Sequence, residues 1–103
     1  MKQLINQIRS TVTFCGFELE AITSHQKYIS IELRSKKRFR KKNYTLGVSK
    51  TLTGLLAAER ELSRDSKKQI LLLDPINNLL EPTLSKKIKL FHDFDQLQVF
   101  LNQ

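Results

Sequence analysis

Hydrophobic and polar residues alternate on both sides of residues 34–42, and this alternation predicts a β-hairpin. The apolar positions share one parity within each flank: Ile29, Ile31 and Leu33 before the segment, and Tyr44, Leu46 and Val48 after it. A period of two residues is typical of a strand with one buried face. We therefore predict strands over Tyr28–Arg34 and Tyr44–Val48, joined by residues 34–42.

A third strand is predicted upstream of this hairpin. From Phe17, the apolar residues Phe17, Leu19 and Ala21 alternate with Glu18 and Glu20, as in a half-buried strand. Residues 23–26 then form a turn into Tyr28. Sequential strands usually pair with their neighbours, so we expect three antiparallel strands in meander order.

Two segments before residue 65 show the 3.6-residue period of amphipathic helices. One apolar stripe predicts a short helix from Lys2 to about Thr11, and it consists of Leu4, Ile5, Ile8 and Val12. The helix should end there because residues 11–14, Thr-Val-Thr-Phe, favour a strand. A second helix, running to about Arg64, carries its apolar residues on one side: Leu52, Leu55, Leu56, Ala58 and Leu62. Ser49 is its predicted N-cap, with Thr51 and Thr53 as competitors, and Gly54 indicates close packing or a ragged start.

The last third of the chain predicts two strands and one helix. Ile70–Leu73 is a continuous apolar run that indicates a buried strand, and one helical turn is expected over Ile76–Leu80. Lys87–Phe91 alternates as an edge strand with lysines on its exposed face. Asp93 or Asp95 should cap a final helix whose core side is Phe94, Leu97, Phe100 and Leu101.

These elements predict one small α+β domain over residues 1–103, with the order α-β-β-β-α-β-β-α. We expect an antiparallel meander sheet, covered by helices on one side.

Charge is concentrated in one place along the chain. The net charge is +8, from 18 Lys and Arg against 10 Asp and Glu, and seven of those cations lie within Arg34–Lys42. The other eleven nearly balance the ten acids. A local cationic patch is a site for polyanions, because seven like charges in one loop repel one another unless a counter-charge binds.

We therefore predict a small nucleic-acid-binding protein that grips phosphates through the basic hairpin, with little sequence readout. The predicted binding residues are Arg34, Lys36, Lys37, Arg38, Phe39, Arg40, Lys41 and Lys42, supplemented by Lys27 and Lys50. Phe39 would stack on an unpaired base, wedge into a groove of the nucleic acid, or anchor the loop. Neither DNA nor RNA, and neither single nor double strands, is favoured by the sequence.

A motif around the second helix resembles the double-stranded-RNA-binding domain family. Gly47, Ser49 and Lys50, followed by the Ala57–Ala58 pair and Leu62, match the family's Gly-x-Ser-Lys-Lys helix start and its Ala-Ala pair, within the α-β-β-β-α order of residues 2–64. The resemblance implies that Lys50 bridges RNA phosphates and that His25 reaches the minor groove. Thr51 and Gly54 stand where the family has two further lysines.

No residue pattern predicts catalysis, a metal site or a cofactor. Glu18, Glu20 and Glu32 should share the polar face of adjacent strands, where salt bridges to Lys27 and Arg34 are favoured over a Mg²⁺ site. His92 stands beside the helix-capping acids Asp93 and Asp95. No nucleophile stands beside a base in a known signature.

The remaining expectations concern compartment and alternative partners. One cysteine, Cys15, excludes an internal disulfide and should be an inert core thiol, and no apolar run spans a bilayer or forms a signal peptide. We expect a cytoplasmic protein. One alternative function is a protein-interaction module whose basic hairpin binds an acidic protein, or an inhibitor whose hairpin occupies a nucleic-acid-processing enzyme. A weaker alternative is that the hairpin binds an anionic membrane surface. The exposed edge strand near Lys89 would allow a homodimer through the sheet edge.

Overall fold

The structure is a computed structural model, and it describes residues 2–36, 42–65, 68–75 and 88–103. Its elements, in chain order, are α1 (Lys2–Phe14), β1 (Phe17–Ser24), β2 (Ile29–Ser35), β3 (Asn43–Val48), α2 (Leu52–Asp65), β4 (Gln69–Leu73), β5 (Ile88–Phe91) and α3 (Phe94–Leu101). The predicted α+β class and element order are confirmed. The helical turn predicted over Ile76–Leu80 lies outside the described residues.

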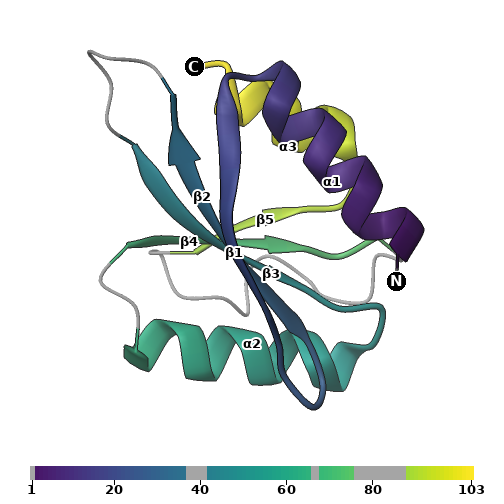
Figure 1. The fold of residues 1–103 in the computed structure, drawn as a ribbon. Coiled ribbons are helices and arrows are strands. Elements are labelled where there is room, and N and C mark those ends of the chain that lie inside the picture. Colours follow the sequence, from purple (N-terminus) through teal and green to yellow (C-terminus); the bar gives the residue numbers. More distant parts are fainter. Residues whose placement is uncertain (1, 37–41, 66–67, 76–87) are drawn as a thin grey trace.

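The five strands form one mixed sheet in the order β1-β2-β3-β4-β5 (Figure 1). The pairs β1–β2 and β2–β3 are antiparallel, which confirms the predicted three-strand meander. The pairs β3–β4 and β4–β5 are parallel, so the meander does not extend to the last two strands. The cause is α2, which returns the chain to the start of β3, where Tyr44 pairs with Gln69.

Helices cover both faces of the sheet, and the predicted single-sided cover is wrong. Helices α1 and α3 lie together on one face and α2 lies on the other (Figure 1). Strand β4 lies between the two layers: Leu71 and Leu73 pack in the core with α1 and α3, whereas Ile70 and Leu72 pack with α2. A strand buried on both faces needs a continuous apolar run, and Ile70–Leu73 is such a run.

Helix α1 extends three residues beyond its predicted end at Thr11, to Phe14. Val12 is fully buried in the core, and this packing outweighs the strand preference of the surrounding residues. The Thr11 hydroxyl donates to the Gln7 carbonyl, 2.9 Å away, as threonines within helices do. Gly16, with φ of 82°, then ends the helix.

Strand β1 contains a β-bulge between Leu19 and Ala21. Beyond it, Ala21 pairs with Glu32 and is exposed, so the prediction that Ala21 continues the buried parity of Phe17 and Leu19 is wrong. One extra residue in one strand of an antiparallel pair shifts the faces of all residues that follow it.

Hydroxyl and carboxylate caps fix the starts of two helices. The Thr51 hydroxyl accepts from the Gly54 backbone N–H at 3.0 Å. The N-cap of α2 is therefore Thr51, one of the two predicted alternatives to Ser49. Ser49 is instead buried, and its hydroxyl donates to the Lys27 carbonyl. The Asp93 carboxylate caps α3 by accepting from the Gln96 N–H at 2.8 Å, which confirms one of the two predicted caps.

Strand β5 forms one edge of the sheet, as predicted, and Lys89 on it is exposed.

Candidate nucleic-acid interface

The base of the basic hairpin is held by backbone hydrogen bonds on both sides. Strands β2 and β3 stay in register as far as the pair Arg34–Asn43, and the Ser35 N–H then donates to the Lys42 carbonyl at 3.1 Å. The Lys36 N–H donates to the Gly16 carbonyl at 2.9 Å, which ties the same segment to the start of β1. The residues directly before and after residues 37–41 are therefore hydrogen-bonded to neighbouring backbone.

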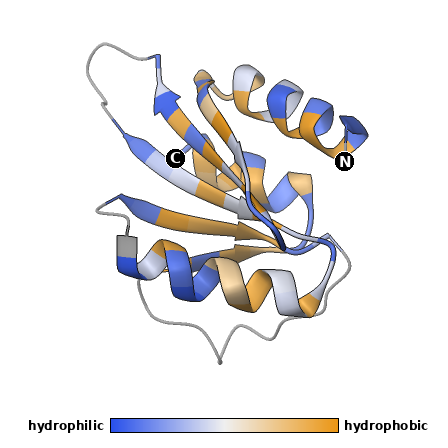
Figure 2. Ribbon diagram, turned by 60° about the horizontal axis from the view of Figure 1, so that its bottom comes forward, coloured by the Kyte–Doolittle hydropathy of each residue, from blue (hydrophilic) through white to orange (hydrophobic). Residues whose placement is uncertain are grey.

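The surface at this end of the sheet is hydrophilic. Figure 2 shows polar residues at the ends of β2 and β3 next to residues 37–41, and apolar residues along the strands between the helix layers. Lys36 and Lys42 are both exposed. The other predicted contacts in the loop lie outside the described residues: Lys37, Arg38, Phe39, Arg40 and Lys41.

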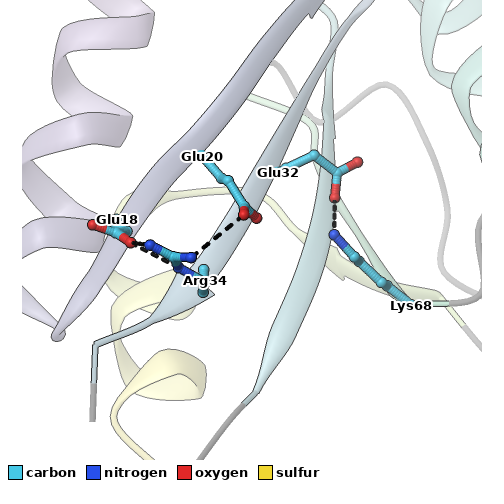
Figure 3. Close-up of polar contacts among 5 residues, drawn as sticks. All are labelled: Glu18, Glu20, Glu32, Arg34 and Lys68. Atoms are coloured by element: carbon cyan, nitrogen blue, oxygen red, sulfur yellow. Dashed lines mark hydrogen bonds and ion pairs between the residues drawn. The ribbon is translucent and has the colours of Figure 1, made fainter.

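Arg34, the first cation of the basic run, is paired with two glutamates of β1 (Figure 3). Its Nε atom donates to Glu18 Oε1 at 2.7 Å, its Nη2 atom forms an ion pair with the same oxygen, and its Nη1 atom lies 3.6 Å from Glu20 Oε1. The hydrogen bond with Glu18 and the charges of both carboxylates raise the pKa of Arg34. Arg34 therefore already has two anionic partners within the protein, both on β1.

Glu32 lies on the same polar face and has its own partners (Figure 3). Its carboxylate accepts from the Thr45 hydroxyl at 3.2 Å and forms an ion pair of 2.7 Å with Lys68 Nζ. Salt bridges of the three glutamates are thus confirmed, and Arg34 is one of the predicted cations. The second cation is Lys68, whereas Lys27, which was also predicted, lies in the β1–β2 turn. Within the described part of the chain, no group of three or more His, Cys, Asp and Glu side chains could hold a metal ion.

Lys27 and Lys50 lie at the opposite end of the β2–β3 hairpin from the basic run. Ile29 pairs with Val48 at that end, and the Ser49 hydroxyl bonds the Lys27 carbonyl, so the β1–β2 turn contacts the start of α2. Six residues of extended strand separate the two ends, or about 20 Å at roughly 3.3 Å per residue. The structure therefore does not bring the two supplementary lysines together with the main patch.

His25, singled out by the family resemblance, lies in the β1–β2 turn. Its ring stacks on Tyr28 with centroids 4.2 Å apart, and its Nε2 atom lies 2.9 Å from Ser30 Oγ. Both contacts hold the imidazole of His25 against residues of the β1–β2 hairpin.

A carboxylate that the sequence patterns did not indicate lies at the ends of the parallel strands. Asp74 directly follows β4 and is fully buried, and its Oδ2 atom lies 3.7 Å from His92 Nδ1, just after β5. The Asp74 N–H donates to the Phe91 carbonyl at 2.8 Å. The apolar run of β4 predicts a buried strand but gives no signal that the aspartate after it is buried as well.

Two further features bear on function. Cys15 is buried, as predicted, and its thiol donates to the Gln98 carbonyl at 3.7 Å. Within the described ranges, no helix has the length and apolar character needed to cross a lipid bilayer.

Comparison with known proteins gives no relative: no family model, no curated protein and no solved structure matches this chain. The resemblance to the double-stranded-RNA-binding domain rests on the motif around α2 and on the α-β-β-β-α order of the first five elements.

Proposed function

We propose that this protein binds nucleic acid through its basic hairpin and contacts phosphates with the cations between Lys36 and Lys42. These cations are Lys36, Lys37, Arg38, Arg40, Lys41 and Lys42. Binding is driven by the release of counterions from the nucleic acid and is largely independent of sequence.

The observation that supports this proposal most strongly is a concentration of positive charge next to a hairpin base that is held by hydrogen bonds. Seven of the eighteen Lys and Arg residues lie within nine positions, and the chain on either side of the loop is bonded to neighbouring strands. A hairpin anchored in this way presents its cations together without the entropy cost of ordering its base. A phosphate backbone carries one charge per roughly 1.7 Å of duplex axis, and it is therefore a dense polyanion that a cluster of cations can bind.

Lys27 and Lys50 have a secondary place in this proposal. A ligand bound at the hairpin would have to extend about 20 Å along the sheet to reach them, which is roughly six base pairs of duplex at 3.4 Å per pair. Short oligonucleotides should therefore bind without these two lysines, and longer ones could use them.

Titration with mixed-sequence nucleic acids at several salt concentrations tests the proposal. About five phosphate contacts predict a slope near −4 to −5 in a plot of log affinity against log salt for duplex DNA. Single-stranded and duplex forms of DNA and RNA should be compared in the same buffer, after removal of any co-purified nucleic acid by high salt. Failure to bind any of them at low salt would contradict the proposal and favour an acidic protein partner.

A further inference from the structure

The bulge in β1 determines what lies opposite the acidic side chains of the hairpin. Regular pairing beyond Leu19–Leu33 would place Glu20 directly opposite Glu32, and like charges in that position destabilise a sheet. The bulge instead places Ala21 opposite Glu32. Glu20 is left outside the pairing, with its carboxylate 3.6 Å from Arg34 (Figure 3).

Arg34 consequently faces two carboxylates from one strand. Glu18 is its cross-strand partner and takes two guanidinium nitrogens on one oxygen, while Glu20 approaches the third nitrogen. The formal charge of the group formed by Arg34, Glu18 and Glu20 is negative by one unit. A phosphate that approached Arg34 would have to displace a carboxylate and remain beside the other.

We propose that Glu18 and Glu20 withhold Arg34 from the bound polyanion and so set the boundary of the binding surface at the base of the hairpin. The phosphate contacts begin beyond this boundary, at Lys36. Arg34 is a positioning residue that joins β2 to β1. This inference rests on the proposed function.

Four proteins form the test: wild type, Arg34→Gln, Glu18→Gln/Glu20→Gln, and the triple variant. Each is titrated with mixed-sequence duplex DNA, and the salt slope is the readout, because it counts phosphates neutralised and is not moved by a purely structural role. Arg34→Gln should change the slope by less than about 0.3 units. Glu18→Gln/Glu20→Gln should steepen it by about 0.9 units, the value for one phosphate contact, and the triple variant should return it to the wild-type value.

A matched control separates the local effect from a general change of charge. Glu59→Gln/Glu61→Gln removes the same number of charges from α2, outside the β1–β2 pair that holds Arg34, and should leave the slope unchanged. Thermal unfolding of every variant verifies that the fold is retained.

Two outcomes would overturn the inference while leaving the proposed function intact. One is a flattening of the slope by about one unit in Arg34→Gln, which would make Arg34 a direct phosphate contact. The other is a slope of Glu18→Gln/Glu20→Gln that is no steeper than the slope of the α2 control. If the wild-type protein binds no nucleic acid, the proposed function fails and the inference fails with it.

Discussion

Gly54 packs directly against Ser49, so that a β-carbon added to Gly54 would overlap the Ser49 hydroxyl and lie 2.8 Å from the Ser49 Cβ atom. The same added atom would overlap the Lys27 carbonyl oxygen. This contact joins the first turn of α2 to the β1–β2 turn. The glycine is therefore required by close packing, which was one of the two explanations suggested by its position in the sequence.

Gly54→Ala should lower stability, although alanine is intrinsically the better helix residue by about 1 kcal/mol. Overpacking against backbone should cost about 1–3 kcal/mol, and urea or thermal unfolding measures the loss. Thr53→Ala is the matched control, because Thr53 is an exposed neighbour in the same turn and alanine there should be neutral or stabilising. Equal stability of Gly54→Ala and wild type would show that the β1–β2 turn yields easily.

Tyr44 should make the protein less stable in alkali. Burial raises the pKa of Tyr44 above its ordinary value of 10.0, and its ring packs between Phe17 and Phe100. The folded state therefore holds the phenol proton more tightly than the unfolded state, so this contribution is complete below about pH 10 and is lost as pH rises through the folded pKa. Unfolding by urea between pH 8 and 11 should show a shallower loss of stability for Tyr44→Phe than for wild type. Parallel curves for the two proteins would contradict this.

Residues 37–41 should be dispensable for folding. We expect that replacing them with Asn-Gly, which leaves Lys36 and its bond to Gly16, keeps the thermal midpoint unchanged or raises it. The reason is that a three-residue Lys-Asn-Gly loop suits a hairpin and that the repulsion among like charges is removed. A midpoint lower by many degrees, or loss of cooperative unfolding, would show that this segment supports the fold.

Phe39→Ala distinguishes base stacking from loop anchoring as the role of the aromatic residue. If the ring stacks on bases, affinity for single strands should fall by about 1–3 kcal/mol, more than for duplexes, while the salt slope stays the same. Loss of thermal stability with unchanged single-strand affinity would instead favour the anchoring role.

The alternation of apolar residues was enough to predict β2 and β3, because both strands are regular and have one parity facing the core of α1 and α3. The same rule failed at Ala21, because a bulge depends on how two strands pair, which the alternation within one strand does not reveal. The two-sided cover of the sheet was also missed. Its signal was the continuous apolar run of β4, which was recognised as buried but not as buried on both faces.

The sequence was sufficient to predict which residues form the candidate site, but it predicted their arrangement in space only in part. The density of cations in residues 34–42 identifies the patch without any fold. Which cations already have acidic partners depends on strand register, and this register pairs Arg34 with Glu18. The distance of Lys27 and Lys50 from the patch likewise follows from the direction of the strands.

The central claim, that the basic hairpin is the phosphate-binding surface, is tested most directly by the salt slope of Arg38→Gln/Arg40→Gln/Lys41→Gln. Against wild type, this variant should lose affinity for all sequences alike, and its slope on duplex DNA should flatten by about two to three units, one for each lost contact. Neutralising Lys86, Lys87 and Lys89 removes three cations outside the patch and should matter less. Unchanged affinity and slope in the hairpin variant, with loss of binding in the Lys86–Lys89 variant, would contradict the claim.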